Sequence, residues 1–147
     1  MSTDLTGGCS CGAIRYRLAS APYDTGWCHC RVCQTSSGAP AVVFSTVPAN
    51  DFRIEQGAET TKWFASTSFG RRMFCGECGS LLAIQVDFQP DEIDFTVATL
   101  DEPEKVRPGF HIFYGSRISW AEAGDALPRH ARFRPNTRGL GSSEPPA

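Results

Sequence analysis

Seven cysteines in three clusters limit how this chain can fold more than any other feature of the sequence. Cys28, Cys30 and Cys33, here called the triplet, form a C-x-C-x-x-C run inside six residues. Such crowding suits a metal ion better than a disulfide, because neighbouring thiolates can converge on one cation while a bridge between such close residues is strained. Zinc prefers four ligands, so the triplet predicts a zinc ion with one open position, which is typical of a catalytic site.

The other four cysteines, here called the quartet, form two glycine-flanked pairs, Cys9-x-Cys11 and Cys75-x-x-Cys78. Glycine allows the sharp turns that bring both sulfurs of a pair to one side. Sulfurs around a tetrahedral zinc ion lie about 3.8 Å apart, which both spacings can span. We therefore predict a structural zinc ion on the quartet, and two zinc ions per chain. The spacing also allows the triplet to share a metal with one pair while the other pair stays idle.

The bulk composition is that of one soluble globular domain, with 147 residues, 41% of them hydrophobic and 20% charged. We expect this domain over residues 1–133 and a disordered tail over 134–147, where Pro, Gly, Ser and Arg follow no period. The net charge of −2 argues against a nucleic-acid partner. The sequence shows no signal peptide and no apolar run of the about 20 residues that span a membrane. We therefore expect no membrane partner and a cytoplasmic protein with reduced thiols.

Short runs of alternating apolar and polar residues, separated by turn residues, predict a mainly β fold with no long helix. The clearest run places Ile93, Phe95 and Val97 on one face. A turn is expected over 22–26, and a loop or a single helical turn over 34–38. Strands are expected over 13–18, 41–46, 52–57, 60–65, 80–86, 92–100 and 110–114, with 117–120 continuing a hairpin.

The three cysteine motifs, taken in order, resemble the glutathione-dependent formaldehyde-activating enzyme family, whose domain is shared with centromere protein V. The residues that carry the resemblance are 7–12 (GGCSCG), 28–33 (CHCRVC) and 74–81 (FCGECGSL), within a match of about 6–134. The resemblance implies a β-tent of small antiparallel sheets meeting at a structural zinc ion on the quartet. It also implies a second zinc ion on the triplet.

The same resemblance implies a reaction, the addition of glutathione to formaldehyde to give S-hydroxymethylglutathione, which is classed as a carbon–sulfur lyase reaction. The partners would then be a small thiol and a small aldehyde. As a mechanism, we expect the thiol to take the open position of a zinc ion on Cys28, Cys30 and Cys33. Zinc lowers the pKa of a bound thiol, so a thiolate would be present at neutral pH to attack the aldehyde.

We make less specific predictions for other side chains near the motifs. His29 should point away from the ligands on either side of it, His111 should be a core or pocket-wall histidine, and His130 should be in solvent. Arg71 and Arg72 are expected on a solvated strand face, with the binding of a substrate carboxylate as the alternative. Five aromatic residues are expected in the core, and three polar residues could line the mouth of the triplet site. These are Trp63, Phe69, Phe110, Phe113 and Trp120, and Gln34, Ser36 and Ser37.

Two other functions are compatible with the motifs. In a non-catalytic β-tent interaction module, both zinc ions would be structural and a protein group such as His29 would complete the triplet site. A zinc-ribbon nucleic-acid binder is the third reading, and the negative net charge opposes it.

Overall fold

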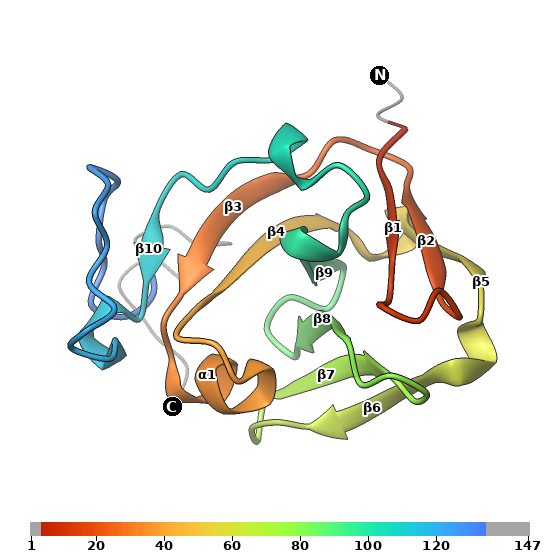
Figure 1. Ribbon diagram of the computed structural model, residues 1–147, viewed down its shortest axis with the longest axis horizontal. Helices are drawn as coiled ribbons and strands as arrows, with labels where there is room; N and C mark the ends of the chain where they lie inside the picture. Colours follow the sequence, from red (N-terminus) through yellow and green to blue (C-terminus); the bar gives the residue numbers. More distant parts are fainter. Residues whose placement is uncertain (1–3, 135–147) are drawn as a thin grey trace. The chain divides into compact units, whose positions relative to one another are not determined.

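The computed structural model describes residues 4–134, and over these residues the fold is mainly β, as the sequence predicted (Figure 1). The described strands are β1 (Thr6–Gly8), β2 (Arg15–Leu18), β3 (Tyr23–Cys28), β4 (Val42–Pro48), β5 (Phe52–Gln56), β6 (Thr61–Ala65), β7 (Gly70–Cys75), β8 (Leu81–Val86), β9 (Glu92–Thr96) and β10 (His111–Ile112). The helices are α1 (Arg31–Ser37) and the short 3-10 turns η1 (Ala49–Asp51), η2 (Ala58–Thr60), η3 (Val97–Thr99), η4 (Pro103–Lys105) and η5 (Tyr114–Ser116). No helix within this range has the length and apolar character needed to cross a membrane.

The chain groups into two compact units. The first unit contains the residues up to 25 and 44–107, and the second contains 26–43 and the residues from 108 onward. The single domain over 1–133 stays a prediction. The disordered tail over 134–147 lies, apart from its first residue, outside the described residues.

In the first unit, β1, β2 and β5 form a small antiparallel sheet. The alternation in β2 places Tyr16 and Leu18 in the core, each 1% exposed, while the arginines between them face outward. The Tyr16 ring lies 4.6 Å from the Phe52 ring and 6.2 Å from the Phe95 ring, centroid to centroid. This aromatic cluster is therefore the centre of the first unit's core.

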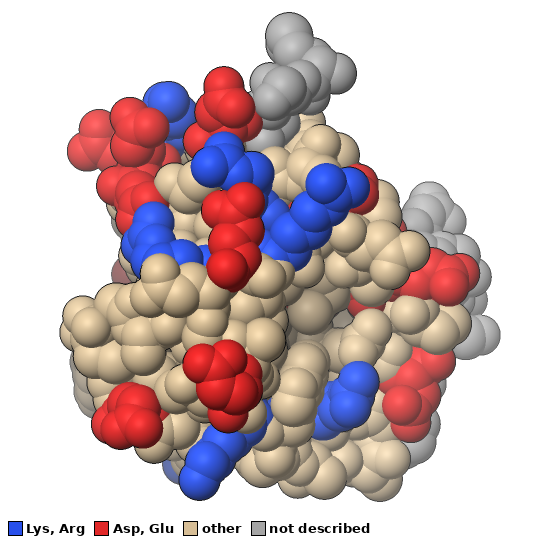
Figure 2. All heavy atoms as spheres, turned by 90° about the vertical axis from the view of Figure 1, so that its right-hand side faces the viewer, with Lys and Arg blue, Asp and Glu red and all other residues tan. Residues whose placement is uncertain are grey.

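The outer face of this sheet has mixed charge. Arg15 pairs with Asp101, and Arg17 pairs with Glu55 at 3.1 Å. Figure 2, which views the molecule from this side, shows basic and acidic side chains next to one another. This face therefore presents no one-signed surface that would favour a polyanion.

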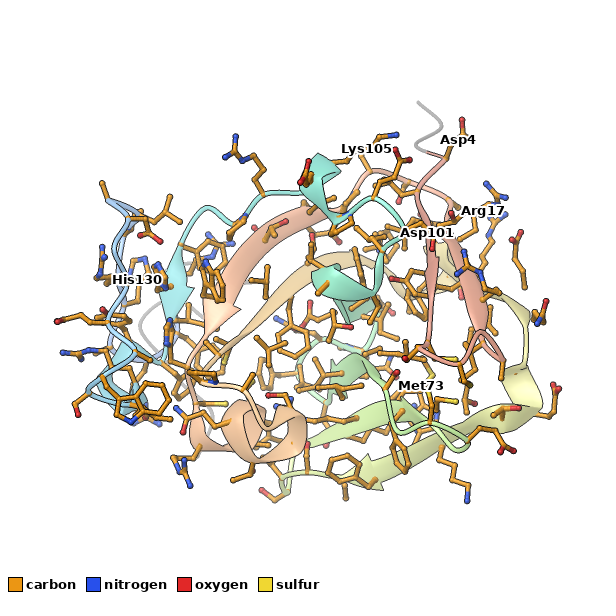
Figure 3. All side chains as sticks on the ribbon, in the orientation of Figure 1. Asp4, Arg17, Met73, Asp101, Lys105 and His130 are labelled. Carbon is orange, nitrogen blue, oxygen red and sulfur yellow. The ribbon has the colours of Figure 1, made fainter. Side chains whose placement is uncertain are left out.

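The second sheet of the first unit has the strand order β4-β9-β8-β7-β6, and all its pairs are antiparallel. Ile93, Phe95 and Val97 are buried as predicted, although the strand ends at Thr96 and Val97 begins the turn η3. Met73 of β7 lies in the interior (Figure 3), at 2% exposure.

Two expectations for this sheet are wrong. Arg72 is 3% exposed, although both arginines of β7 were expected in solvent, because both faces of the strand are covered at Arg72 and Met73. Trp63 was expected in the core but is 37% exposed, because β6 lies at the edge of the sheet.

In the second unit, the last residues of β3 pair in parallel with β10, His111 opposite Trp27 and Ile112 opposite Cys28. The turn expected over 22–26 is not formed, because from Tyr23 onward these residues belong to β3. Gly26 reads as a turn residue but is needed for close packing, since a Cβ there would lie 2.2 Å from the ring of Phe110.

The hairpin expected from 110–114 into 117–120 is also not formed. Phe113 has a positive φ of 52°, which turns the chain from β10 into η5. Residues 117–120 contain no strand, and Trp120 is 74% exposed rather than in the core. Phe110 and Phe113 are half-buried.

Candidate metal centres

The quartet brings together four sulfur atoms that lie far apart in the sequence. The sulfurs of Cys9, Cys11, Cys75 and Cys78 all lie within 4.8 Å of one another. The Cys9 and Cys11 sulfurs are 3.6 Å apart, and those of Cys11 and Cys75, 64 positions apart in sequence, are separated by 3.8 Å. Sulfurs bound to one tetrahedral zinc ion are expected at about 3.8 Å, so the donor set fits such an ion.

Backbone N–H groups point at these sulfurs. Ile14 donates to the Cys9 sulfur at 3.2 Å, and Glu77 and Cys78 both donate to the Cys75 sulfur at 3.4 Å. Each of these hydrogen bonds favours a thiolate over a thiol. The backbone turns of the two cysteine pairs therefore favour the thiolate form, which is the form that binds a cation.

Hydrogen bonds and crowding shift the pKa values of the quartet thiols in opposite directions. The pKa of Cys78 is lowered to about 5, first through the hydroxyl of Ser80 and then through its backbone N–H. For Cys11, a backbone hydrogen bond from Ala13 lowers the pKa, but the Cys9 thiol and burial raise it, and the pKa rises to about 12. Four thiolates so close together repel one another, and a divalent cation removes that repulsion.

The triplet forms a separate group at the junction of β3 and α1. The sulfurs of Cys28, Cys30 and Cys33 lie within 4.8 Å of one another, and Cys28 and Cys33 are buried. Among the residues from 4 to 134, no histidine, aspartate or glutamate joins this group. The triplet thus offers three ligand atoms. The two cysteine pairs of the quartet lie together, so neither pair joins the triplet.

Local structure explains how the triplet is shaped. Cys30 is the N-cap of α1, and its sulfur accepts a hydrogen bond from the Cys33 N–H at 3.3 Å. Gly38 ends the helix with a positive φ of 72°. Residues 34–37 of the stretch expected to be a loop or one helical turn therefore belong to a seven-residue helix. The pKa of Cys28 is raised well above its usual value by the Cys30 and Cys33 thiols and then by burial, which again indicates crowding that a cation would relieve.

Two histidines of the second unit, His29 and His111, are buried and contact each other. His29 is 3% exposed and its Nε2 lies 2.8 Å from Nδ1 of His111, which is 2% exposed. Burial lowers the pKa of His29, and the positive charges of Arg117 and Arg129 lower it further, so its ring is neutral at neutral pH. His29 thus contacts His111 rather than joining the sulfur group, and His111 is the satisfied core histidine that the sequence predicted.

The polar residues expected at the mouth of the site have other partners. Gln34 is buried, and its Nε2 donates to the His29 carbonyl at 2.8 Å. The hydroxyls of Ser36 and Ser37 donate to carbonyls of the preceding helical turn, both at 2.6 Å. His130, labelled in Figure 3 and expected in solvent, is half-buried, and its N–H donates to the His111 carbonyl at 2.9 Å.

The sequence model of the glutathione-dependent formaldehyde-activating enzyme family matches residues 4–116. The chain belongs to this family. The matched residues contain all seven cysteines of the quartet and the triplet, so the resemblance stated from the three motifs is confirmed.

Similar proteins support the assignment. A Halomonas elongata protein described as a putative glutathione-dependent formaldehyde-activating enzyme is 29% identical over 129 residues, 80% of each chain. A Schizosaccharomyces pombe protein described as an uncharacterized lyase is 30% identical over 76 residues, about half of each chain. The crystal structure of a Rhodobacter sphaeroides protein superposes with a TM-score of 0.57 at 25% identity, covering 84% of this chain and 98% of the other.

Sequence reasoning missed one residue of the second unit. Asp125 lies in a loop without strand or helix, and its carboxylate oxygens lie 3.0 and 3.1 Å from Nε2 of His111. Nothing in the periodicity of residues 121–128 indicates this contact, because it depends on how the loop returns to β10.

Proposed function

We propose that this protein is a zinc-dependent carbon–sulfur lyase that interconverts a small thiol, a small aldehyde and their adduct, with glutathione and formaldehyde as the pair. The family match and the lyase name of the yeast relative support an enzyme of this class. The observation that carries the proposal is the triplet, which presents three sulfurs and no fourth ligand among residues 4–134.

In this proposal the quartet holds a structural zinc ion and the triplet holds a second one. Three sulfurs leave one of zinc's four positions for the sulfur of the substrate. A zinc ion there would lower the pKa of that thiol, so that a thiolate is available at neutral pH. The donor sets support this division, because the quartet is complete by itself and the triplet is not.

The chain's own residues shape the reaction site. The Cys30 sulfur caps α1, and Gln34 on the same helix holds the carbonyl of His29, so the ligand segment has a fixed conformation. In the adduct-forming direction, the thiolate sulfur forms a bond to the aldehyde carbon. The carbonyl π pair moves to oxygen, which takes up the proton that the thiol lost. The reverse steps break the carbon–sulfur bond and release thiol and aldehyde.

The proposal is tested by exchange NMR on glutathione and ¹³C-formaldehyde, which form the adduct slowly by themselves. The wild-type protein should accelerate the exchange and carry two zinc ions per chain. Cys30→Ser should lose the acceleration and one zinc ion, because serine keeps the helix cap but removes a thiolate. The control is Thr35→Ser, an exposed hydroxyl on the same helix. Unchanged zinc content and unchanged exchange in Cys30→Ser would refute the proposal.

A further inference from the structure

A chain of hydrogen bonds runs from the surface of the second unit to the residue between two members of the triplet. Asp125, whose side chain is 39% exposed, contacts Nε2 of His111 at 3.0 Å. Nδ1 of His111 contacts Nε2 of His29 at 2.8 Å, and both histidines are at least nine-tenths buried. Asp125 lies in a loop, His111 belongs to β10, and His29 directly follows the last residue of β3.

The chemistry of the three groups sets the direction of these hydrogen bonds. Burial raises the pKa of the Asp125 carboxyl, but hydrogen bonds from His111 and the Leu127 N–H outweigh this, and the pKa is lowered. An ionised carboxylate can only accept, so Nε2 of His111 donates to it. In the tautomer of His111 that donates from Nε2, Nδ1 is an acceptor, so Nε2 of His29 donates to it. Asp125 therefore selects the tautomer of both rings.

Hydrogen bonds also hold the backbone of His29. Its N–H donates to the carbonyl of Ile112 at 3.1 Å, and its carbonyl accepts from Nε2 of Gln34 at 2.8 Å. Cys28 and Cys30 are bonded to this residue on either side. Fixing the ring and both peptide groups of His29 therefore limits how far these two cysteines can turn.

Aromatic packing keeps the two rings in place. The Trp27 ring stacks on the His111 ring at 6.0 Å with an interplanar angle of 9°. The Tyr114 ring stands edge-on to His29 at 5.0 Å and to His111 at 5.5 Å. Neither histidine can rotate without displacing one of these rings.

From these contacts we infer that Asp125 and His111 are positioning residues for the metal of the triplet, acting through the His29 ring on the orientation of Cys28 and Cys30. The inference rests on the proposed function in requiring a metal at the triplet. Hydrogen-bond partners just outside a ligand set commonly change metal affinity by about 10–100-fold. Since this chain acts through the backbone of the ligand segment, we expect the lower end, about tenfold.

The test is a cobalt(II) titration of the metal-free full-length protein, because cobalt–thiolate absorption reports both affinity and geometry. Bands that are missing in Cys30→Ser belong to the triplet, and the remaining bands belong to the quartet. Asp125→Ala removes the acceptor, and His111→Phe keeps an aromatic ring against Trp27 but removes both hydrogen bonds. Asp125→Asn keeps the size and one acceptor oxygen. Glu122→Ala, which removes an exposed carboxylate of the same loop, is the matched control.

We expect Asp125→Ala and His111→Phe to weaken cobalt binding at the triplet about tenfold and to shift its bands, with the quartet unchanged. Asp125→Asn should restore most of the affinity, and Glu122→Ala should match the wild type. Wild-type affinity and spectrum in both Asp125→Ala and His111→Phe would overturn the inference, as would equal weakening at both sites in every variant. If Asp125→Ala does not fold, the inference would be overturned by an equal cobalt affinity of the triplet in His111→Phe and Asp125→Asn. A wild-type protein that binds cobalt only at the quartet would instead refute the proposed function.

Discussion

Replacing Cys9 and Cys11 together by serine should destabilise the protein more than any comparable change at the triplet. A metal on the quartet joins residues that are 64 positions apart in the sequence, as between Cys11 and Cys75. With both serines in place, a metal remaining on Cys75 and Cys78 no longer closes this loop. Serine is nearly isosteric with cysteine, and its hydroxyl can still accept the Ile14 hydrogen bond that Cys9 accepts.

The size of the effect follows from the length of the loop. A cross-link that closes a 64-residue loop restricts the unfolded chain by an entropy worth about 4 kcal/mol at 25 °C. The ligands of the triplet lie within five positions, from Cys28 to Cys33, and the same relation gives about 2 kcal/mol. The quartet should therefore contribute about twice as much to the free energy of unfolding.

Urea denaturation of the zinc-loaded proteins, followed by far-UV circular dichroism, measures both values. The matched control is Cys30→Ser with Cys33→Ser, which also changes one buried and one more accessible cysteine. Metal content is measured alongside, so that each variant is known to have lost the intended ion. Equal destabilisation by the two double variants, or a larger effect at the triplet, would refute the reasoning.

Two further predictions concern the first unit. Gly57→Ala should lower the free energy of unfolding by at least about 1 kcal/mol, because Gly57 has a φ of 81° and a Cβ would lie 2.0 Å from the Ala13 carbonyl oxygen. Gly124→Ala, where nothing lies within 4 Å, is the control, and equal urea midpoints would contradict the packing argument. Burial raises the pKa of Tyr16 above its usual value, and the hydrogen bond with the Thr99 hydroxyl offsets only part of this rise. Because the unfolded chain then loses its phenol proton first, stability should fall above pH ~10 by up to about 1.4 kcal/mol per pH unit. Tyr16→Phe should remove this fall in pH-dependent denaturation, and the same slope in both proteins would show that another group causes it.

The cysteine pattern could be predicted well because its geometry is local. Two sulfurs in a C-x-C or C-x-x-C turn are brought together by a few residues. The preferred allocation then divides seven cysteines into four and three, although the spacing also allows the triplet to share a metal with one pair. The structure groups the same residues, Cys9, Cys11, Cys75 and Cys78 in one set and Cys28, Cys30 and Cys33 in the other. The β2 and β9 alternations were equally readable, because each strand has one face on the core.

The failures have a common cause in contacts between distant segments. Glycine at position 26 is a residue type that indicates a turn. In the structure, its lack of a side chain instead leaves room for the ring of Phe110, which lies 84 positions later in the sequence. The burial of Arg72 depends on what covers both faces of β7, and the exposure of Trp63 depends on β6 being an edge strand. Asp125 lies in a loop without a pattern, and only the return of that loop to β10 brings it to His111. No periodic pattern or motif in the sequence indicates any of these contacts.

In the proposed function, the triplet keeps one zinc position open for a thiol. X-ray absorption at the zinc edge, on protein carrying two zinc ions, tests it most directly when spectra are recorded with and without glutathione. With four sulfurs at the quartet and three at the triplet, we expect about 3.5 sulfur ligands per zinc ion without glutathione. With glutathione bound, we expect about four sulfur ligands per zinc ion. A sulfur number that does not change when glutathione is added would contradict the claim.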